Sequence, residues 1–423
     1  RGSVEIDLTP ELQAYINGYY FNDKGSSYTR RIDFDPNNIS NTQPFAVKSN
    51  TPNENLNRSK GGSFDLTWRT GDVELRSLTA YDQTNTQYRY DVDGTAVRLA
   101  EFAVGINMNV FTQEIQALDS AHFIHPFTDH GDLATRGARV IDRAEGIYVW
   151  DSEGHRMLDG MSGLWCVNAG YARKELADAA HAQMMKLPFY NSFFQTTNEP
   201  AVRLAARLAE LAPRVGERRF DHVFFSSSGS ESNDSNVRMV RRYWDLLGQP
   251  QRKVIISRRN AYHGSTMAGA SLGGMSGMHA QGDLPIPGIT HIEQPYFYDN
   301  ALPGESAEAF GLRAAGWLEE KIRQVGPDQV AAFIAEPVQG AGGVIIPPST
   351  YWPEIQRIVD KYGILLVSDE VICAFGRLGH WFAYEKFGYK PDLVTFAKAV
   401  TSGYIPLGGV MVGDRVAQVL IEQ

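Results

Sequence analysis

The sequence has little cysteine: Cys166 and Cys373 are the two in 423 residues, and they are far apart. That number excludes a disulfide framework and a four-cysteine zinc site, so no metal site is expected, and it fits a reducing compartment. The chain also lacks an apolar run of the roughly 18 to 20 residues that a membrane helix needs. It has no basic run and a formal net charge of −9, which argues against nucleic-acid binding.

Asparagine and methionine are unevenly distributed along the chain. Twelve Asn lie between residues 1 and 120 and seven lie after them, whereas nine of the ten Met come after residue 120. This change in composition indicates two unlike pieces that are joined near residues 112–121.

The first piece shows the alternation of antiparallel strands. Phe64, Leu66 and Trp68 alternate with polar residues, and a turn signal at 70–72 leads into a second alternating run at 73–76. A two-sided surface sheet in a soluble protein would give the same pattern. Weaker examples of such strands lie at 12–20 and 109–118.

Residues 60–118 resemble barrel strands of a TonB-dependent outer-membrane receptor. Three stretches carry this resemblance, at 61–68, 75–81 and 111–115. It implies that residues 1–116 are a short fragment of such a receptor, and that the edges of their sheet stay unpaired.

The second piece alternates short apolar runs with helical patterns. Apolar residues recur at a helical period within 201–211, 317–325 and 355–359. This repetition predicts a mostly parallel sheet covered on both faces, with ligands bound beyond the carboxyl ends of its strands. The predicted strands are 222–225, 253–256, 331–334, 364–367 and 392–396.

The loops after two of these strands suit a flat, phosphorylated ligand. Residues 226–234 read SSSGSESND and open a helix, where free N–H groups and the helix dipole can bind phosphate. Helix capping alone would explain the same residues. Tyr262-His263 follows another strand and can stack on a ring, with a structural loop as the alternative.

Ionisable residues follow three further strands. Glu336, Asp369 and Lys398 each come at the end of an apolar run, where a charge is costly unless it is paired or used. Each alone could be a structural ion pair. Together with the two loops they predict a site for a phosphorylated aromatic aldehyde, because a lysine can form the imine while a carboxylate keeps the ring nitrogen protonated.

From about residue 117 to 423 the chain resembles the class III aminotransferases of pyridoxal-phosphate (PLP) fold type I. More narrowly, it is similar to the omega-transaminases that move an amine to pyruvate. The stretches that carry the resemblance are HPFT at 125–128, GLWCVN at 163–168, SGSE at 228–231, YHG at 262–264, EPVQGAGG at 336–343, DEVIC at 369–373 and AKAVTSGY at 397–404.

The resemblance implies roles for nine residues. Lys398 matches the Schiff-base lysine, and Asp369 matches the carboxylate that pairs with the pyridinium nitrogen. Tyr262 and Val371 match the residues on the two ring faces. Gly229 and Ser230 match phosphate-binding positions, and Glu336 matches a carboxylate near the ring. Phe127 and Trp165 match residues that shape the substrate pocket, partly across a dimer interface.

The resemblance also implies the reaction and its setting. A primary amine or omega-amino acid would donate its amino group to pyridoxal 5'-phosphate, and pyruvate or another keto acid would accept it, in ping-pong kinetics. The enzyme would be a homodimer in the cytoplasm, without nucleic-acid or membrane partners for residues 117–423. The alternatives are another reaction on this fold, such as a racemase or an aminomutase, and a non-catalytic chimaeric fragment.

The expected fold class is therefore α/β: a PLP fold type I large domain, an incomplete small domain and a preceding antiparallel β-hairpin segment. The expected domains are the strand segment 1–116, the N-terminal part of the small domain at 117–170, and the PLP-binding large domain at 171–423. Because the chain ends at Gln423, before the family's remaining C-terminal part, we expect a truncated and chimaeric chain with impaired activity. Ala374 and Leu378 stand where the family usually has Gly and Thr.

Overall fold

The computed structural model of this chain describes residues 2–25, 55–70, 73–87, 89–92, 95–98, 115–116, 118–215 and 218–422. It divides into two compact units, one of Arg1–Ala144 with Val149–Met157 and one of Glu145–Tyr148 with Leu158–Gln423. Among the described helices, none combines the length and the apolar character that crossing a membrane requires.

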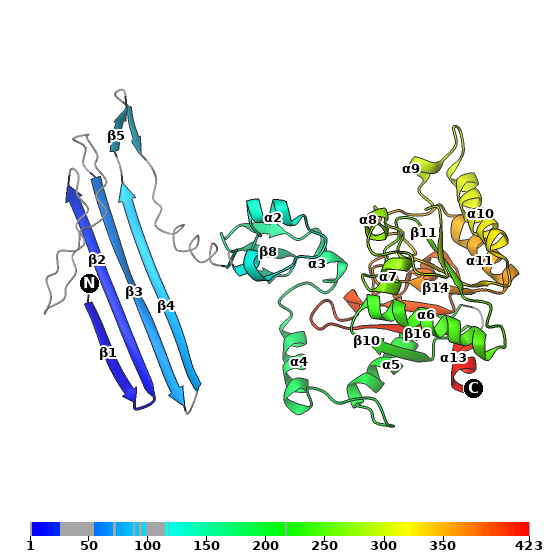
Figure 1. The fold of residues 1–423 in the computed structure, drawn as a ribbon, viewed down its shortest axis with the longest axis horizontal. Helices are drawn as coiled ribbons and strands as arrows, with labels where there is room; N and C mark the ends of the chain where they lie inside the picture. Colours follow the sequence, from blue (N-terminus) through cyan, green and yellow to red (C-terminus); the bar gives the residue numbers. More distant parts are fainter. Residues whose placement is uncertain are drawn as a thin grey trace. The chain divides into compact units, whose positions relative to one another are not determined.

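The first unit contains an antiparallel sheet of four long strands in the order β1-β2-β3-β4 (Figure 1). Thr70 of β3 pairs with Val73 of β4, so the two predicted strands are confirmed, while Gly71 and Asp72 of the turn signal lie outside the described residues. Every residue of β1 is exposed, so this strand contributes nothing to a core. The strands are β1 (Gly2–Thr9), β2 (Leu12–Gly25), β3 (Asn55–Thr70) and β4 (Val73–Gln87), followed by the hairpin of β5 (Arg89–Val92) and β6 (Thr95–Arg98).

One predicted strand is wrong where it can be checked. Most of 109–118 lies outside the described residues, but residues 115, 116 and 118 are helical. Beyond them come α2 (His130–Arg136), a three-stranded sheet of β7 (Ile141–Glu145), β8 (Tyr148–Asp151) and β9 (Arg156–Leu158), and the short turn α3 (Ser162–Trp165).

The second unit is built on a seven-stranded sheet in the order β10-β16-β15-β14-β13-β11-β12. Only β16 runs antiparallel to its neighbours β10 and β15, so the predicted, mostly parallel α/β sheet is confirmed. The strands are β10 (His222–Ser226), β11 (Val254–Arg258), β12 (Ile289–Ile292), β13 (Val330–Ala335), β14 (Leu365–Asp369), β15 (Leu393–Phe396) and β16 (Gly408–Val412).

Helices cover both faces of this sheet. Alternate residues of one strand go to opposite faces: Phe333 packs in the cluster of α5, α10, α11 and α12, and Ile334 packs in that of α6, α7 and α13. Because β13 is buried along its whole length, it reads as a continuous apolar run. The helices are α4 (Lys174–Lys186), α5 (Glu199–Leu211), α6 (Gly229–Leu246), α7 (Met267–Leu272), α8 (Ser276–His279), α9 (Phe297–Asn300), α10 (Ala307–Val325), α11 (Tyr351–Tyr362), α12 (Ala383–Phe387), the 3-10 turn η1 (Lys398–Val400) and α13 (Asp414–Glu422).

The sequence did not predict β12 and β16. Strand β16 starts with Gly408 and Gly409, which weaken a strand pattern. The structure gives the reason for a glycine there: a Cβ on Gly409 would lie 2.5 Å from Cζ of Phe396. Close packing against the neighbouring strand β15 therefore requires glycine at position 409.

Candidate active site

The carboxyl ends of β10, β11, β13, β14 and β15 meet at one edge of the sheet, because these strands run in the same direction. The segments that follow them carry the predicted chemical groups. Together they line a cavity of about 320 Å³. All seven residues predicted to bind the cofactor are in its lining: Gly229, Ser230, Tyr262, Glu336, Asp369, Val371 and Lys398.

Asp369 is the most strongly constrained acid of the cavity. It is the last residue of β14 and is 3% exposed. Its Oδ2 accepts hydrogen bonds from Nδ2 of Asn233 and Nδ1 of His263, both at 2.7 Å, and its Oδ1 accepts from the backbone N–H of Val371 at 3.1 Å. Three N–H donors thus fix the plane of this carboxylate.

Glu336 is a second buried carboxyl in the cavity. Its Oε1 accepts from the backbone N–H of Tyr262 at 3.1 Å and its Oε2 from that of Gly340 at 2.9 Å. Burial raises the pKa of Glu336, while the nearby His263 opposes that shift. The carboxyl therefore joins the turn after β11 to the loop after β13.

The start of α6 forms another wall. Ser228 caps this helix through its Oγ, which accepts from the N–H of Glu231. The first N–H groups of a helix have no partners within it, so those of Gly229 and Ser230 are available to an anion at the positive end of an 18-residue helix. A Cβ on Gly229 would lie 2.8 Å from Cγ2 of Val371, so only glycine fits between this helix and that side chain.

Lys398 begins the 3-10 turn that directly follows β15. Its φ is +49°, in the left-handed region where a non-glycine residue stores about 1–3 kcal/mol of strain. Such strain is maintained only where the surrounding structure requires it. Here it places the lysine in the lining of the same cavity as Asp369.

Tyr262 and Val371 provide a ring and an aliphatic side chain for the cavity. Val371 lies two residues after the end of β14, and Tyr262 lies in the turn after β11. Burial raises the pKa of the Tyr262 hydroxyl, which keeps it neutral. Both side chains line the cavity and are of the kind that packs on the faces of a flat ligand.

The two predicted substrate residues are not in the cavity lining. Phe127 belongs to the first unit, where it is 72% exposed. Trp165 belongs to the second unit, in the turn that leads to Cys166, and Cys166 does line the cavity.

That turn has an uncommon backbone. Ser162, Gly163, Leu164 and Trp165 have φ values of +51°, +59°, +68° and +62°, one turn of left-handed helix. Oδ2 of Asp159 holds it by accepting from the N–H of Gly163 and from the hydroxyl of Tyr171, both at 2.7 Å.

Several lining residues were not predicted from the sequence. Cys166, Asn233, His263, Thr401 and Gly403 all line the cavity. The Tyr-His pair was recognised only as a stacking candidate, whereas His263 lies buried against Asp369. Asn233 lies at helical spacing from Val237 and Val240 of α6, and a polar residue on such an apolar stripe is the sequence signal that could have marked it.

The cavity suits a phosphorylated pyridine aldehyde. It offers free N–H groups for a phosphate, an amine for the aldehyde, and an acceptor-only carboxylate for a ring N–H. Within the described residues, no group of three His, Cys, Asp or Glu side chains could hold a metal ion. The fold and the site together define a PLP-type transferase scaffold.

Comparison with known proteins agrees with that class. Residues 133–422 match the model of the class-III aminotransferases, and the chain belongs to this family. The predicted family and enzyme class are therefore confirmed, together with fold type I, and the enzymes of this family depend on PLP.

The relatives are transaminases of amines and amino acids. The chain is 58% identical over 313 residues to the putrescine–pyruvate aminotransferase of Pseudomonas aeruginosa, covering 74% of this chain and 67% of the relative. It is 47% identical over 289 residues to gamma aminobutyrate transaminase 2 of Solanum lycopersicum, covering 68% and 62%. The chain thus spans about two thirds or less of the length of these relatives.

Solved structures give the same result. An (S)-enantioselective omega-transaminase from Thermomicrobium roseum superimposes with a TM-score of 0.70 at 47% identity, covering 74% of this chain and 68% of that one. An omega-transaminase from Pseudomonas jessenii in complex with PMP gives 0.71 at 42% identity, with 73% and 67% covered.

Proposed function

We propose that this chain catalyses PLP-dependent transamination, moving an amino group from a primary amine or omega-amino acid to pyruvate or another keto acid. One observation carries the proposal: the seven residues predicted to bind the cofactor line a single cavity at the carboxyl edge of the sheet. The 58% identity to a putrescine–pyruvate aminotransferase supports an amine donor and pyruvate as acceptor.

Each residue of the cavity has a separate task in this proposal. Gly229 and Ser230 bind the phosphate through backbone N–H groups. Asp369 holds a proton on the ring nitrogen, and Tyr262 and Val371 enclose the ring. PLP, when bound, withdraws electrons from the substrate carbon that carries the amine. The amine of Lys398 would hold the cofactor at its aldehyde carbon and would move the proton at that substrate carbon.

The proposed pocket also has a substrate end. We assign Phe127 and Trp165 to it by resemblance, and Glu336 to the cofactor side. The left-handed turn supports the assignment of Trp165, because that turn delivers Cys166 to the cavity lining.

Absorbance spectroscopy and a coupled assay test this proposal. The chain incubated with PLP should develop a near-visible band that Lys398→Ala removes. With putrescine or another primary amine as donor, it should consume pyruvate, measured with lactate dehydrogenase. Lys321→Ala, outside the cavity, is the control and should keep both properties. A chain that binds PLP through Lys398 but leaves pyruvate untouched would point instead to a racemase or an aminomutase.

The active form in this proposal is a homodimer in the cytoplasm. Large apolar side chains are exposed on α4 and the segment after it, and a second copy of the chain would cover them. They are Met184, Met185, Phe189, Tyr190, Phe193 and Phe194. The two cysteines are free, as expected for a protein of a reducing compartment.

Residues 1–116 have no task in this proposed reaction. We propose that they form a domain distinct from 117–170 and 171–423, derived from a TonB-dependent outer-membrane receptor. Long antiparallel strands that pair with their neighbours in sequence, together with the full exposure of β1, support that origin. A chain lacking residues 1–116 should bind PLP as the whole chain does, and loss of the absorbance band in a folded deletion variant would contradict this.

A further inference from the structure

Behind Asp369 lies a chain of buried polar groups that the proposed reaction does not use. Asn233 and Asn236 of α6 and Thr395 of β15 are each at most 2% exposed. In a protein interior such groups are costly unless their hydrogen bonds are made. Asn233 makes all four of the bonds that its amide can form, which is more than its burial in a helix requires.

The partners of Asn233 fix the direction of its amide. Nδ2 donates to Oδ2 of Asp369 at 2.7 Å and to the backbone oxygen of His263 at 2.8 Å, and both of these atoms only accept. On the other side, Oδ1 accepts from Nδ2 of Asn236 at 3.1 Å and from Oγ1 of Thr395 at 2.8 Å. If the Asn233 amide were reversed, its Oδ1 would face Oδ2 of Asp369, and two acceptors would then be in contact.

The hydroxyl of Thr395 has a fixed direction as well. Oγ1 accepts from Nδ2 of Asn236 at 2.7 Å, so its own proton is free to go to Asn233. The order of donation thus runs from Asn236 to Thr395, then to Asn233, and ends on Asp369. Each bond aligns the next one, because hydrogen bonds in a low-dielectric interior reinforce one another.

We infer that Asn233, oriented by Thr395, is a positioning residue that clamps the Asp369 carboxylate in the direction in which it meets a cofactor ring nitrogen. This inference rests on the proposed function. Asn233 shares Oδ2 with His263, and the N–H of Val371 takes one position on Oδ1. With these three donors in place, the remaining lone pairs of the Asp369 carboxylate can accept a hydrogen bond from the ligand.

The affinity for PLP tests whether Asn233 positions the Asp369 carboxylate. Asn233→Leu keeps the volume but removes both donors, and the dissociation constant of PLP, measured by absorbance titration, should rise by about tenfold to a hundredfold, the usual effect of losing a hydrogen bond to a charged group. Thr395→Val keeps the shape of the β15 side chain. It should raise the dissociation constant of PLP by about tenfold, because the side-chain amide of Asn233 can then reverse. Far-UV circular dichroism and thermal unfolding of each apo variant show whether it is folded.

Ser257→Ala is the matched control. Ser257 lies fully buried in β11, and within the described residues its hydroxyl has no hydrogen-bond partner. Removing this hydroxyl should leave the dissociation constant within about twofold of wild type, since the change breaks no bond that leads to Asp369.

Asn233→Asp separates positioning from a merely structural role. It places a second carboxyl beside Asp369, and two carboxylates at this distance cannot both stay ionised. The affinity of this variant should fall more steeply with rising pH than that of wild type, and it should partly recover at low pH, where the shared proton restores a donor.

The outcomes distinguish this inference from the proposed function. If wild type forms no cofactor absorbance at Lys398, the proposed function fails and the inference fails with it. If wild type binds PLP and folded Asn233→Leu and Thr395→Val bind it equally well, the inference alone is overturned. The inference is supported if Asn233→Leu and Thr395→Val both bind PLP more weakly than wild type and Ser257→Ala binds it equally well. The affinity of Asn233→Asp should in addition show the steeper pH dependence.

Discussion

At the residue scale, Gly264 leaves room for the start of α6. Its φ is +133°, and an added Cβ would lie 2.7 Å from Oγ and 2.8 Å from Cα of Ser230. The Cα is backbone and cannot turn aside, so the turn after β11 or the start of α6 would have to move.

Gly264→Ala should therefore cost about 1–3 kcal/mol of unfolding free energy, as overpacking does, and should weaken PLP binding at Ser230. Denaturant titration and absorbance titration measure the two effects. Gly248→Ala is the control: its φ is also positive, +70°, but its added methyl would meet no described atom within 4 Å. Equal losses in both variants would mean that backbone strain, rather than crowding at Ser230, is responsible.

The location of a site residue decides whether it could be predicted from the sequence. Lys398, Asp369 and Glu336 were predicted because each follows an apolar strand, and such positions meet at one edge of a parallel sheet. Asn233 and Thr395 were not, because they lie inside a helix and a strand, where a polar residue has no pattern that marks its partner. The positions of Phe127 and Trp165 depend on tertiary structure that periodicity does not carry.

At the scale of elements, α10 and α11 are joined by one carboxylate. Glu319 of α10 accepts from Nζ of Lys361 at 2.5 Å and from the hydroxyl of Tyr362 at 3.0 Å, and Arg323 lies 3.0 Å away. The hydrogen bond from Lys361, followed by that from Tyr362 and the nearby cations, outweighs burial and lowers the pKa of Glu319 from 4.5 to about 2.

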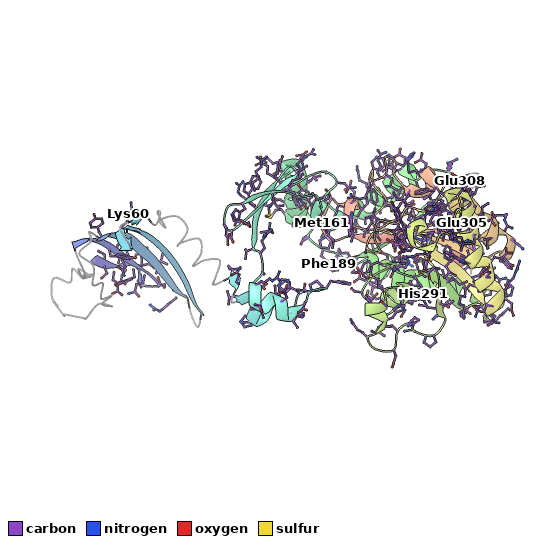
Figure 2. All side chains as sticks on the ribbon, turned by 90° about the horizontal axis from the view of Figure 1, so that it is seen from above. Lys60, Met161, Phe189, His291, Glu305 and Glu308 are labelled. Carbon is purple, nitrogen blue, oxygen red and sulfur yellow. The ribbon has the colours of Figure 1, made fainter. Side chains whose placement is uncertain are left out.

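A lowered pKa in the folded state stabilises the fold above the unfolded value and ceases to do so below the folded one. The contribution of Glu319 should thus be complete above pH 4.5 and disappear as the pH falls toward 2. Glu319→Gln should lower the melting temperature at pH 7 and show a smaller further loss between pH 4.5 and pH 2 than wild type. Glu308→Gln, on the exposed first turn of the same helix (Figure 2), should behave like wild type.

The left-handed turn at Ser162–Trp165 also depends on one carboxylate. A left-handed conformation costs about 1–2 kcal/mol for each non-glycine residue, and two hydrogen bonds to Asp159 offset part of that cost. Asp159→Ala should release the turn, raising the KM for the amine by about tenfold, while the PLP absorbance band stays intact. Asp178→Ala, at an exposed site in α4, should change neither, and a lost PLP band in Asp159→Ala would show that the turn serves the cofactor instead.

At the scale of the whole molecule, exposed apolar side chains should determine the oligomeric state. Phe189, labelled in Figure 2, and Phe194 are 80% and 93% exposed in the segment after α4. Monomers rarely expose a large apolar patch, so these rings should lie in the proposed dimer interface. The double variant Phe189→Asp, Phe194→Asp should shift sedimentation from dimer to monomer, whereas Tyr298→Asp, 88% exposed in α9, should not. A wild-type chain that sediments as a monomer would refute the proposed homodimer.

The register of two neighbouring strands also sets the distance between the reactive groups. Asp369 is paired with Thr395 across β14 and β15, and Lys398 comes three residues after Thr395. A slip of one residue between these strands would displace the amine relative to the carboxylate by about 3.3 Å. Correct pairing of these two strands is thus a requirement for bringing the amine and the carboxylate into one site. Uptake of PLP would then serve as a count of correctly folded molecules in any preparation of this protein.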